Sequence, residues 1–420
     1  MTADAPARSS TRELSGLRFR NEITLLLSAA LLIFVVTVVI GILNGIDAVD
    51  FNQKILLTHV HAGTLGWITM AVFASTFWLF GQGDVSGWQA TLPRLLAPAA
   101  VIAIPILVIA FGTTYGEFRP IMGTITGLVI VGFLVWTAAR ARAVTLSTPR
   151  WGILAALTTS VSGAVFGVLY AFQVATDTKL LPSGGEDAHP ATMVVGFLLP
   201  VGMSLTEWWL RPETTETPAD RAGLVQMGAL FAGGVFLILG ILLDLVPLIG
   251  ISLPLQILAV VLFLRRNGRA IRSVAWTEPR AGRLFSVSAI AIVLNIGFIA
   301  YLIVRYEGEF DDVPDRLLLA LDHIMFIGVM TLSVFGMLTE ATRPARAVAA
   351  WADNLIFWAV TTGLAGFALG LITEVVWLKR VSTPVLGVGI LLALAVFAAR
   401  VRVTVGDTPS GDAARPAAAV

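Results

Sequence analysis

The sequence of 420 residues contains no cysteine and few charged residues. Without cysteine, the chain has no disulfides, no thiolate nucleophiles, no iron–sulfur ligands and no cysteine-bound zinc. Only 13% of the residues are charged, against about 25% in soluble domains. So few charges cannot cover a water-facing surface, and the composition therefore predicts that lipid is the solvent. The net charge of +1 gives no reason to expect a nucleic-acid partner.

Hydrophobic residues make up 57% of the chain, in runs that reach the roughly 20 residues a helix needs to cross a bilayer. The sequence predicts an all-α polytopic protein with a single twelve-helix membrane domain at 22–403 and tails at 1–21 and 404–420. The stretch before Arg20 and the second tail, which is rich in Ala, Pro and Asp, are both expected to be disordered. The expected spans are 22–47, 56–81, 93–114, 120–141, 151–174, 189–210, 222–243, 245–264, 284–304, 317–339, 353–376 and 381–400.

The basic residues predict an orientation. Lys and Arg accumulate in cytoplasmic loops, and with the N-terminus inside, 21 of the 28 fall on the inner side. The opposite loops are acidic, as at Glu309 and Asp312. The first span follows four arginines and is too long for the apolar region of a signal peptide, so we expect an uncleaved anchor. The predicted location is a bacterial or archaeal cytoplasmic membrane, with both termini cytoplasmic.

Histidine is also scarce, and its four positions are regular. His59 and His61 lie on the second span, His189 on the sixth and His323 on the tenth, all near the outer face. His59 and His189 each precede a glycine by seven residues, whereas His61 and His323 precede one by five. This pattern predicts three four-helix units around a pseudo-threefold axis. Their expected bounds are 22–142, 151–265 and 284–400.

Histidines at membrane depth are costly and usually functional, and a neutral imidazole can bind a metal. Because His59 and His61 are two residues apart, they point to nearly opposite faces of a helix and cannot serve one haem. A bis-histidine haem therefore needs one of them together with His323. Alternatively, each histidine is simply wetted at the interface. Gly63, Gly66 and Gly328 would admit a flat macrocycle close to the backbone, although small residues also serve helix packing.

Two segments resemble a known family. LLTHVHAGTLGW, from Leu56 to Trp67, resembles helix 2 of the catalytic subunit of haem–copper oxidases and nitric oxide reductases. LALDHIMFIGVMTLSVFG, from Leu319 onward, stands where that family carries the His-x-His of helix 10. The resemblance implies a twelve-helix bundle in which helices 2 and 10 ligate a low-spin haem, by default haem b. Alignment of the helix-2 motif implies His61 rather than His59 as the ligand opposite His323.

The resemblance implies further site residues near the outer face. Lys379 and Arg380 occupy the place where the family binds the haem propionates, and Arg316 is a third candidate for this role. His189 is what remains of the family's second metal centre. Together with His59, it forms a candidate second metal site, with copper as the candidate ion.

The departures from the family limit the expected function. The first histidine of the helix-10 pair is replaced by Leu321, and residues 222–243 contain no histidine. We therefore do not expect an oxygen reductase, but a haem protein of electron transfer or nitric oxide metabolism. If the chain is an enzyme, the resemblance implies an oxidoreductase of the cytochrome oxidase or nitric oxide reductase type. A small cytochrome or another redox subunit is the expected partner, since the chain has no c-type haem attachment motif.

Two other functions stay open. The chain is similar in pattern to twelve-helix proteins of the NnrS type, associated with haem, copper and the nitrosative stress response. It lacks their Trp-His-x-His-Glu start, because Thr58 to Ala62 reads THVHA. The other alternative is a transporter without a cofactor. Carriers built from two halves should repeat near residue 210, however, whereas the histidines divide this chain in three.

Other polar residues within the spans predict structural roles. Glu207 and Glu340 lie at inner helix ends, where their carboxylates can reach the interface. Asn295 lies in mid-helix, and its amide can bond to a neighbouring helix. Asp322, beside His323, either orients a nearby group or faces water.

Overall fold

The computed structural model describes residues 13–113, 116–309 and 312–406. Within these ranges, twelve helices are long and apolar enough to cross a membrane, and each corresponds to a predicted span. The prediction of an all-α polytopic membrane protein is confirmed. The predicted break between the spans 222–243 and 245–264 is also confirmed, because Asp244 adopts a left-handed φ of 55° in the turn between the two helices.

Nine spans are single α-helices. They are α1 (Arg20–Gly45), α4 (Trp88–Thr113), α5 (Phe118–Ala141), α6 (Thr148–Thr176), α9 (Arg221–Leu242), α10 (Val246–Arg272), α11 (Ala281–Arg305), α14 (Ala352–Ile372) and α15 (Val376–Gly406). The other three are composite helices with a π-helical segment in the middle. They are α2 (Gln53–His61), η3 (Ala62–Thr69) and α3 (Met70–Phe80); α7 (Gly185–Ala191), η4 (Thr192–Leu198) and α8 (Leu199–Leu210); and α12 (Asp315–His323), η7 (Ile324–Thr331) and α13 (Leu332–Ala341). Short 3₁₀ turns occur at Leu14–Gly16, Pro212–Thr215 and Arg343–Ala345.

The predicted tails lie largely outside the described residues. Of the C-terminal tail, residues 404–406 continue α15, so the helix extends slightly past the expected boundary. Of the N-terminal tail, the part from residue 13 is described. Leu14 is fully buried and Phe19 is 4% exposed, so this part packs onto the bundle and the expectation of disorder before Arg20 is wrong for the described residues.

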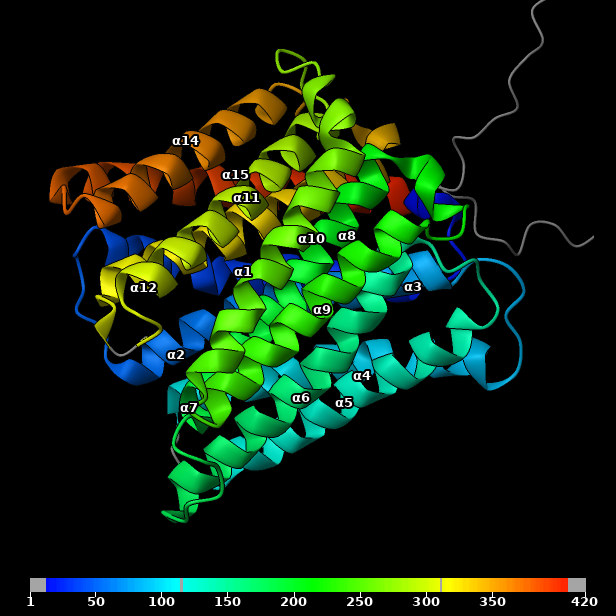
Figure 1. Cartoon of the computed structure of the whole chain (residues 1–420). Helices are drawn as coiled ribbons and strands as arrows, with labels where there is room; N and C mark the ends of the chain where they lie inside the picture. Colours follow the sequence, from blue (N-terminus) through cyan, green and yellow to red (C-terminus); the bar gives the residue numbers. More distant parts are fainter. Residues whose placement is uncertain (1–12, 114–115, 310–311, 407–420) are drawn as a thin grey trace, which may run out of the picture.

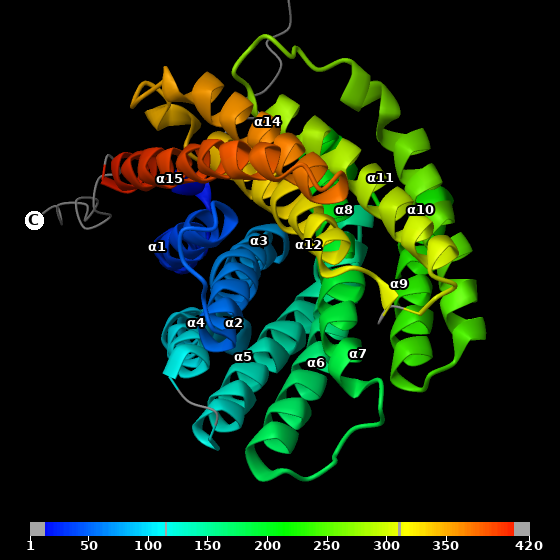
Figure 2. The same cartoon turned by 90° about the vertical axis from the view of Figure 1, so that its left-hand side faces the viewer.

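The twelve spans form three units of four. Each unit contributes one composite helix to a group of three at the centre of the bundle. Unit 1 spans α1 to α5, unit 2 spans α6 to α10, and unit 3 spans α11 to α15. The outer helices pack in chain order, α5 against α6 and α10 against α11, and α15 closes the ring against α1. The three composite helices are the most buried. In their apolar 18-residue stretches 61–83% of the residues are buried, against 33–56% in the other nine spans. They therefore stand inside the ring, as the view along the bundle shows (Figure 2).

The composite helices share a local irregularity just after their histidines. Widening of the backbone is visible in the hydroxyl bonds: Thr69 donates to the carbonyl of Thr64, and Thr331 to that of Phe326, five residues back rather than four. Trp67 joins two of these segments by donating from Nε1 to the hydroxyl of Thr331 at 3.0 Å. Such π segments frequently mark functional sites. Here all three begin at the residue after α2, α7 or α12 ends.

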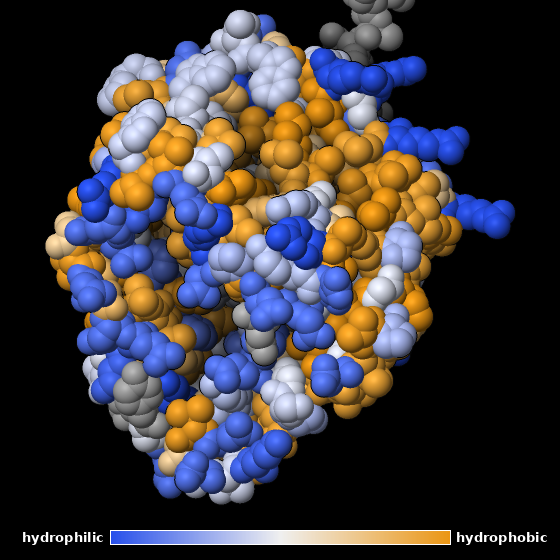
Figure 3. Space-filling view, turned by 60° about the vertical axis from the view of Figure 1, so that its left-hand side comes forward, coloured by the Kyte–Doolittle hydropathy of each residue, from blue (hydrophilic) through white to orange (hydrophobic). Residues whose placement is uncertain are grey.

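The end of the bundle that carries α2, α7 and α12 is called the histidine end (Figure 1). Polar residues gather over this end, whereas much of the flank is hydrophobic (Figure 3). At the opposite end, buried arginines bind backbone carbonyls at the end of an inner helix or in the connection that follows one. Arg140 of α5 donates to the carbonyls of Phe80 and Gln82, and Arg400 of α15 donates to that of Val348. At the C-terminus of α3, Arg140 thus donates to carbonyls that have no partner within the helix, and its charge interacts favourably with the helix dipole.

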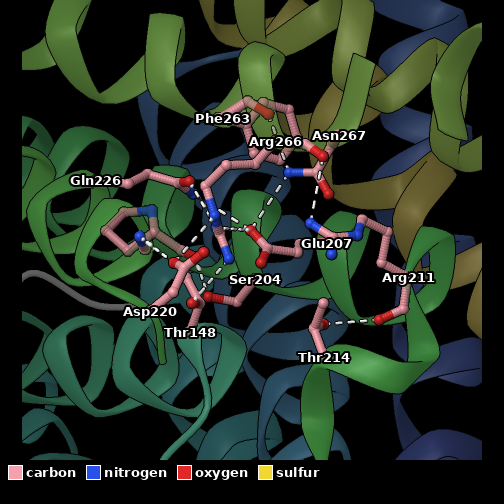
Figure 4. A network of polar contacts seen from close by, with 12 residues as sticks. Thr148, Ser204, Glu207, Arg211, Thr214, Asp220, Gln226, Phe263, Arg266 and Asn267 are labelled. Carbon is pink, nitrogen blue, oxygen red and sulfur yellow. Dashed lines mark hydrogen bonds and ion pairs between the residues drawn. The ribbon is translucent and has the colours of Figure 1, made fainter. Parts of the chain in front are cut away.

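In unit 2 the equivalent arginine, Arg266, binds a carboxylate of the inner helix, whereas Arg400 of unit 3 pairs with Asp353 of α14 at 2.8 Å. Glu207 is fully buried and accepts from Nη1 of Arg266 at 2.8 Å, with Gln226 and Asn267 close by (Figure 4). Arg266 also lies 3.4 Å from a carboxylate oxygen of Asp220. The expectation that the Glu207 carboxylate reaches the interface is therefore wrong, because the side chain points into the bundle toward α9 and α10.

Candidate functional site

The four histidines face two separate cavities. Cavity A is a hollow of about 850 Å³, open mouth included, and its lining contains His59 of α2 and His323 of α12. Cavity B is a hollow of about 900 Å³ on the same measure, and its lining contains His61 of α2 and His189 of α7. Cavity A lies between units 3 and 1, and cavity B lies between units 1 and 2.

The structure does not bring together the histidines that the alignment pairs on one haem. His61 lines cavity B and His323 lines cavity A. The pair suggested for a second metal, His59 and His189, is divided between the cavities in the same way. The cause is the alternation expected for residues two apart on a helix. Helix α2 stands between the cavities and presents one histidine to each.

His59 and His189 are held by the preceding helix of their own unit. Nδ1 of His59 lies 2.9 Å from the carbonyl oxygen of Thr37, and Nδ1 of His189 lies 2.9 Å from that of Gly163. One turn further along, each imidazole lies against a glycine. A Cβ atom would stand 3.0 Å from Cε1 of His59 at residue 41, and 2.7 Å from Cε1 of His189 at residue 167. We call this arrangement the cross-helix histidine.

His61 and His323 are held within their own helix instead. Nδ1 of each lies 2.8 Å from the carbonyl oxygen of the residue four positions earlier. Each imidazole also contacts a phenylalanine from the third span of its unit. His61 stacks on Phe111 with ring centroids 3.7 Å apart, and His323 lies 4.7 Å from Phe367. We call this arrangement the same-helix histidine, and each cavity contains one histidine of either kind.

These hydrogen bonds determine the tautomer of all four rings. A backbone carbonyl can only accept, so Nδ1 must carry the proton and the neutral ring keeps its lone pair on Nε2. Within the described part of the chain, no hydrogen bond involves an Nε2 atom of these histidines. Metal-binding histidines are held in this way, with the second nitrogen donating to a carbonyl. All four Nε2 atoms therefore carry the lone pair through which a neutral imidazole can bind a metal ion.

The lining of cavity A fits a flat apolar cofactor. It is formed chiefly by aliphatic and aromatic side chains, among them Phe34, Phe326 and Leu386, and it includes Gly63. Gly66 and Gly328, also considered for close approach of a macrocycle, instead pack against neighbouring helices. A Cβ atom would stand 2.3 Å from Ile33 at residue 66 and 2.9 Å from Ala291 at residue 328.

The expected propionate ligands lie beyond the cavity lining and bind acidic side chains. Lys379 and Arg380 donate to the two carboxylate oxygens of Asp47 at 2.7 and 2.8 Å. These bonds hold the pKa of the Asp47 carboxyl below its ordinary value. The carbonyl of Lys379 accepts from Thr383, which lines cavity A, so the ion pair lies one helical turn outward of the cavity.

Arg316, the third candidate for the propionates, is bound to the end of α14. Its guanidinium donates to the carbonyls of Leu371 and Ile372 at 3.2 and 3.0 Å and pairs with Glu374. This contact stabilises the C-terminus of a helix. The side chain does not line cavity A.

Two polar residues near the histidines have defined places. Asp322 lines cavity A beside His323. The amide of Asn295 donates to the carbonyl of Leu321 at 3.1 Å, a bond to a neighbouring helix of the kind expected. Leu321 itself is 7% exposed and stands where the family's additional histidine would be.

A metal held by protein side chains alone has little support in this arrangement. Among the residues that the structure describes, no three histidine, aspartate or glutamate side chains converge as a metal site. A haem needs only two side chains, because its macrocycle supplies the other four nitrogens. Each cavity offers two histidine side chains, the number that a haem would require.

Sequence reasoning missed the partners of the histidines. Thr37 and Gly163 supply carbonyls to the cross-helix rings, and Phe111 and Phe367 contact the same-helix rings. A signal existed in part, because a glycine follows each of these two carbonyls by four residues, at 41 and 167. In a sequence with 39 glycines, that spacing is visible only once the helix pairs are known.

The comparisons with known proteins do not assign a family. No protein-family model matches the sequence, and no curated protein matches it.

Proposed function

We propose that the protein is a haem-binding membrane protein of electron transfer, with a haem b in cavity A between His59 and His323. One observation carries this proposal. Two imidazoles from different units face the same apolar cavity, and both have Nδ1 bound to a carbonyl and Nε2 left open. The proposal replaces His61 by His59 as the partner of His323.

The residues of the chain have separate tasks at this site. The carbonyls of Thr37 and Leu319 hold the two rings in the tautomer that ligates. Phe367 supports the ring of His323 from one side. When bound, the haem supplies one-electron exchange. His59 and His323 would hold the metal and the apolar lining would limit the access of water, and ligation by two histidines would favour electron transfer over turnover of a gas.

Lys379 and Arg380 are the residues that would receive the haem carboxylates. They are held one turn outward of Thr383, on a helix that lines the cavity. Asp47 occupies the same two donors in the structure, so a carboxylate of the cofactor would compete with an existing one. An external donor such as a small cytochrome would approach from this end.

The alternatives receive less support from the geometry. A copper site built jointly from His59, His61 and His189 is not favoured, because these side chains are divided between two cavities. A cofactor-free carrier of two halves is not favoured either, since the helices are arranged in three units.

The test is a reduced-minus-oxidised visible spectrum of protein purified from haem-replete cells. We expect a low-spin haem b signal that His59→Ala and His323→Ala each diminish to the same extent. Thr58→Ala, beside His59 but outside the lining of cavity A, is the matched control and should keep the wild-type signal. A signal unchanged in both histidine variants, or no haem in the wild type, would refute the proposal.

A further inference from the structure

Cavity B repeats the chemistry of cavity A at the next interface around the ring. Its same-helix histidine, His61, comes from unit 1, and its cross-helix histidine, His189, comes from unit 2. In cavity A, the same-helix histidine comes from unit 3 and the cross-helix histidine from unit 1. Each cavity is therefore built by one rule, with the two kinds of histidine contributed by successive units.

The third interface lacks this pair. Five residues before Gly196, where unit 2 would carry a same-helix histidine, the chain has Ala191. Seven residues before Gly328, where unit 3 would carry a cross-helix histidine, it has Leu321. Neither side chain can bind a metal. The histidines are thus absent from one interface and complete at the other two, which is the pattern expected of two ligand sites rather than of scattered interfacial residues.

Cavity B also has a cation at its histidine end. Arg119 lies at the start of α5, lines the cavity and is only 6% exposed. It donates to the carbonyl of Phe111 at 3.1 Å, and its guanidinium lies 4.8 Å from the centre of that ring. Phe111 is stacked on His61 at 3.7 Å, so the arginine, the aromatic ring and the imidazole form one connected group. Lys379 and Arg380 occupy the corresponding start of the fourth span in unit 3.

We propose that cavity B is a second haem site, in which His61 and His189 would hold the iron through their Nε2 atoms and Arg119 would bind a carboxylate of the cofactor. The inference rests on the proposed function in taking haem as the ligand, but not in where the first haem lies. The Nε2 atoms of this pair are left open by carbonyl bonds of 2.8 and 2.9 Å at Nδ1. Apolar side chains such as Leu107 and Val168 form much of the remaining lining.

The arrangement gives α2 a role as the partition between two redox sites. His59 and His61 are two residues apart on this helix and belong to different cavities.

The experiment counts haem per chain in purified full-length protein and measures its spin state by electron paramagnetic resonance. We expect two low-spin haems in the wild type. His189→Ala and His61→Ala should each remove one haem or convert it to a high-spin form. Added imidazole should return that form to low spin. His59→Ala should do the same to the other haem, and the His59→Ala/His189→Ala double variant should retain no low-spin haem. Gel filtration and thermal unfolding establish that each variant is folded.

The two proposals fail differently in this experiment. One haem per chain, lost in His59→Ala and unchanged in His61→Ala and His189→Ala, would refute the second site and leave the first. One haem that responds only to His61→Ala and His189→Ala would support cavity B and refute the haem in cavity A. A folded wild type without haem would refute both.

Discussion

At the scale of single residues, the histidines depend on what lies beside them. His189 approaches α6 so closely that only a glycine fits at position 167, where a Cβ atom would stand 2.7 Å from Cε1 and 2.9 Å from Nδ1. The same contact at residue 41 is looser, at 3.0 Å from Cε1 of His59. The ring position, and with it the direction of Nε2, is therefore set by the absence of a side chain on the facing helix.

We predict that Gly167→Ala displaces the His189 ring, breaks its bond to the Gly163 carbonyl and lowers the low-spin haem content assigned to cavity B. Gly41→Ala should act on cavity A in the same direction but less strongly. Gly297→Ala is the control, since no atom lies within 4 Å of the added Cβ. It should keep the haem spectrum and, through helix propensity, gain up to about 1 kcal/mol in stability. A wild-type spectrum in Gly167→Ala would contradict this account of the ring.

Asp47 should give a pH dependence at the histidine end. Its pKa in the folded protein is lowered by the bonds from Lys379 and Arg380, below the value of about 3.9 of the unfolded chain. The ion pair therefore stabilises the fold fully above that value, and its contribution disappears as the pH falls through the lowered pKa.

The measurement is the thermal unfolding of wild type and Asp47→Asn in detergent between pH 3 and 7. We expect wild type to unfold at the higher temperature at neutral pH, and the difference to shrink toward the acid end of the range. Asp177→Asn, at another left-handed turn residue, controls for the change of residue type. A difference that grows on acidification would contradict the assigned sign.

At the scale of elements, the composite helices are anchored at both ends by different chemistry. At one end, each π segment begins within three residues after a histidine. At the other end, Arg140 binds the carbonyl of Phe80 at the end of α3 and Arg266 binds Glu207 on α8, whereas Arg400 binds the carbonyl of Val348 in the connection that follows α13. In units 1 and 2 the inner helix is thereby held against the fourth span of its own unit, so His59, His61 and His189 lie on elements whose far ends are fixed.

We predict that Arg266→Ala is strongly destabilising, by about 3–5 kcal/mol, because it leaves the fully buried carboxylate of Glu207 unpaired. The Glu207→Gln/Arg266→Ala double variant should recover part of this loss, since the buried charge is removed as well. Arg265→Ala, at an exposed neighbouring position, should change little. Unfolding of the three variants in mixed detergent micelles measures the effect. Equal stability of Arg265→Ala and Arg266→Ala would show that the pair contributes nothing.

At the scale of the whole molecule, the three units form three interfaces. Two of these interfaces, at cavities A and B, contain a pair of histidines. A haem in each would place both cofactors at the same end of the bundle. The charge distribution predicts that this end faces away from the cytoplasm, since most basic residues lie at the other end.

The absence of cysteine makes that orientation testable with single substitutions. Ser183 at the histidine end and Ser86 at the opposite end both lie at exposed loop positions, and each can be replaced by cysteine. We expect a membrane-impermeant thiol reagent to label Ser183→Cys in intact cells and Ser86→Cys only after permeabilisation. The reverse pattern would show that the termini lie outside, and the wild type serves as the unlabelled control.

The sequence by itself determined the twelve spans and the separation of His59 from His61. Both follow from local properties, since hydropathy identifies a span and two-residue spacing sends side chains to opposite faces of any helix. The alternation of glycines and histidines also indicated three units before any contact was known.

Only the tertiary structure decided which histidines share a cavity and which carboxylates are buried. The alignment paired His61 with His323, whereas the rotation of α2 presents His59 to that cavity. Glu207 and Glu340 both lie at inner helix ends, yet only the first is fully buried, since α9 and α10 cover it. These outcomes depend on the neighbours that each helix face meets, and such contacts join residues dozens to hundreds of positions apart, which no local pattern records.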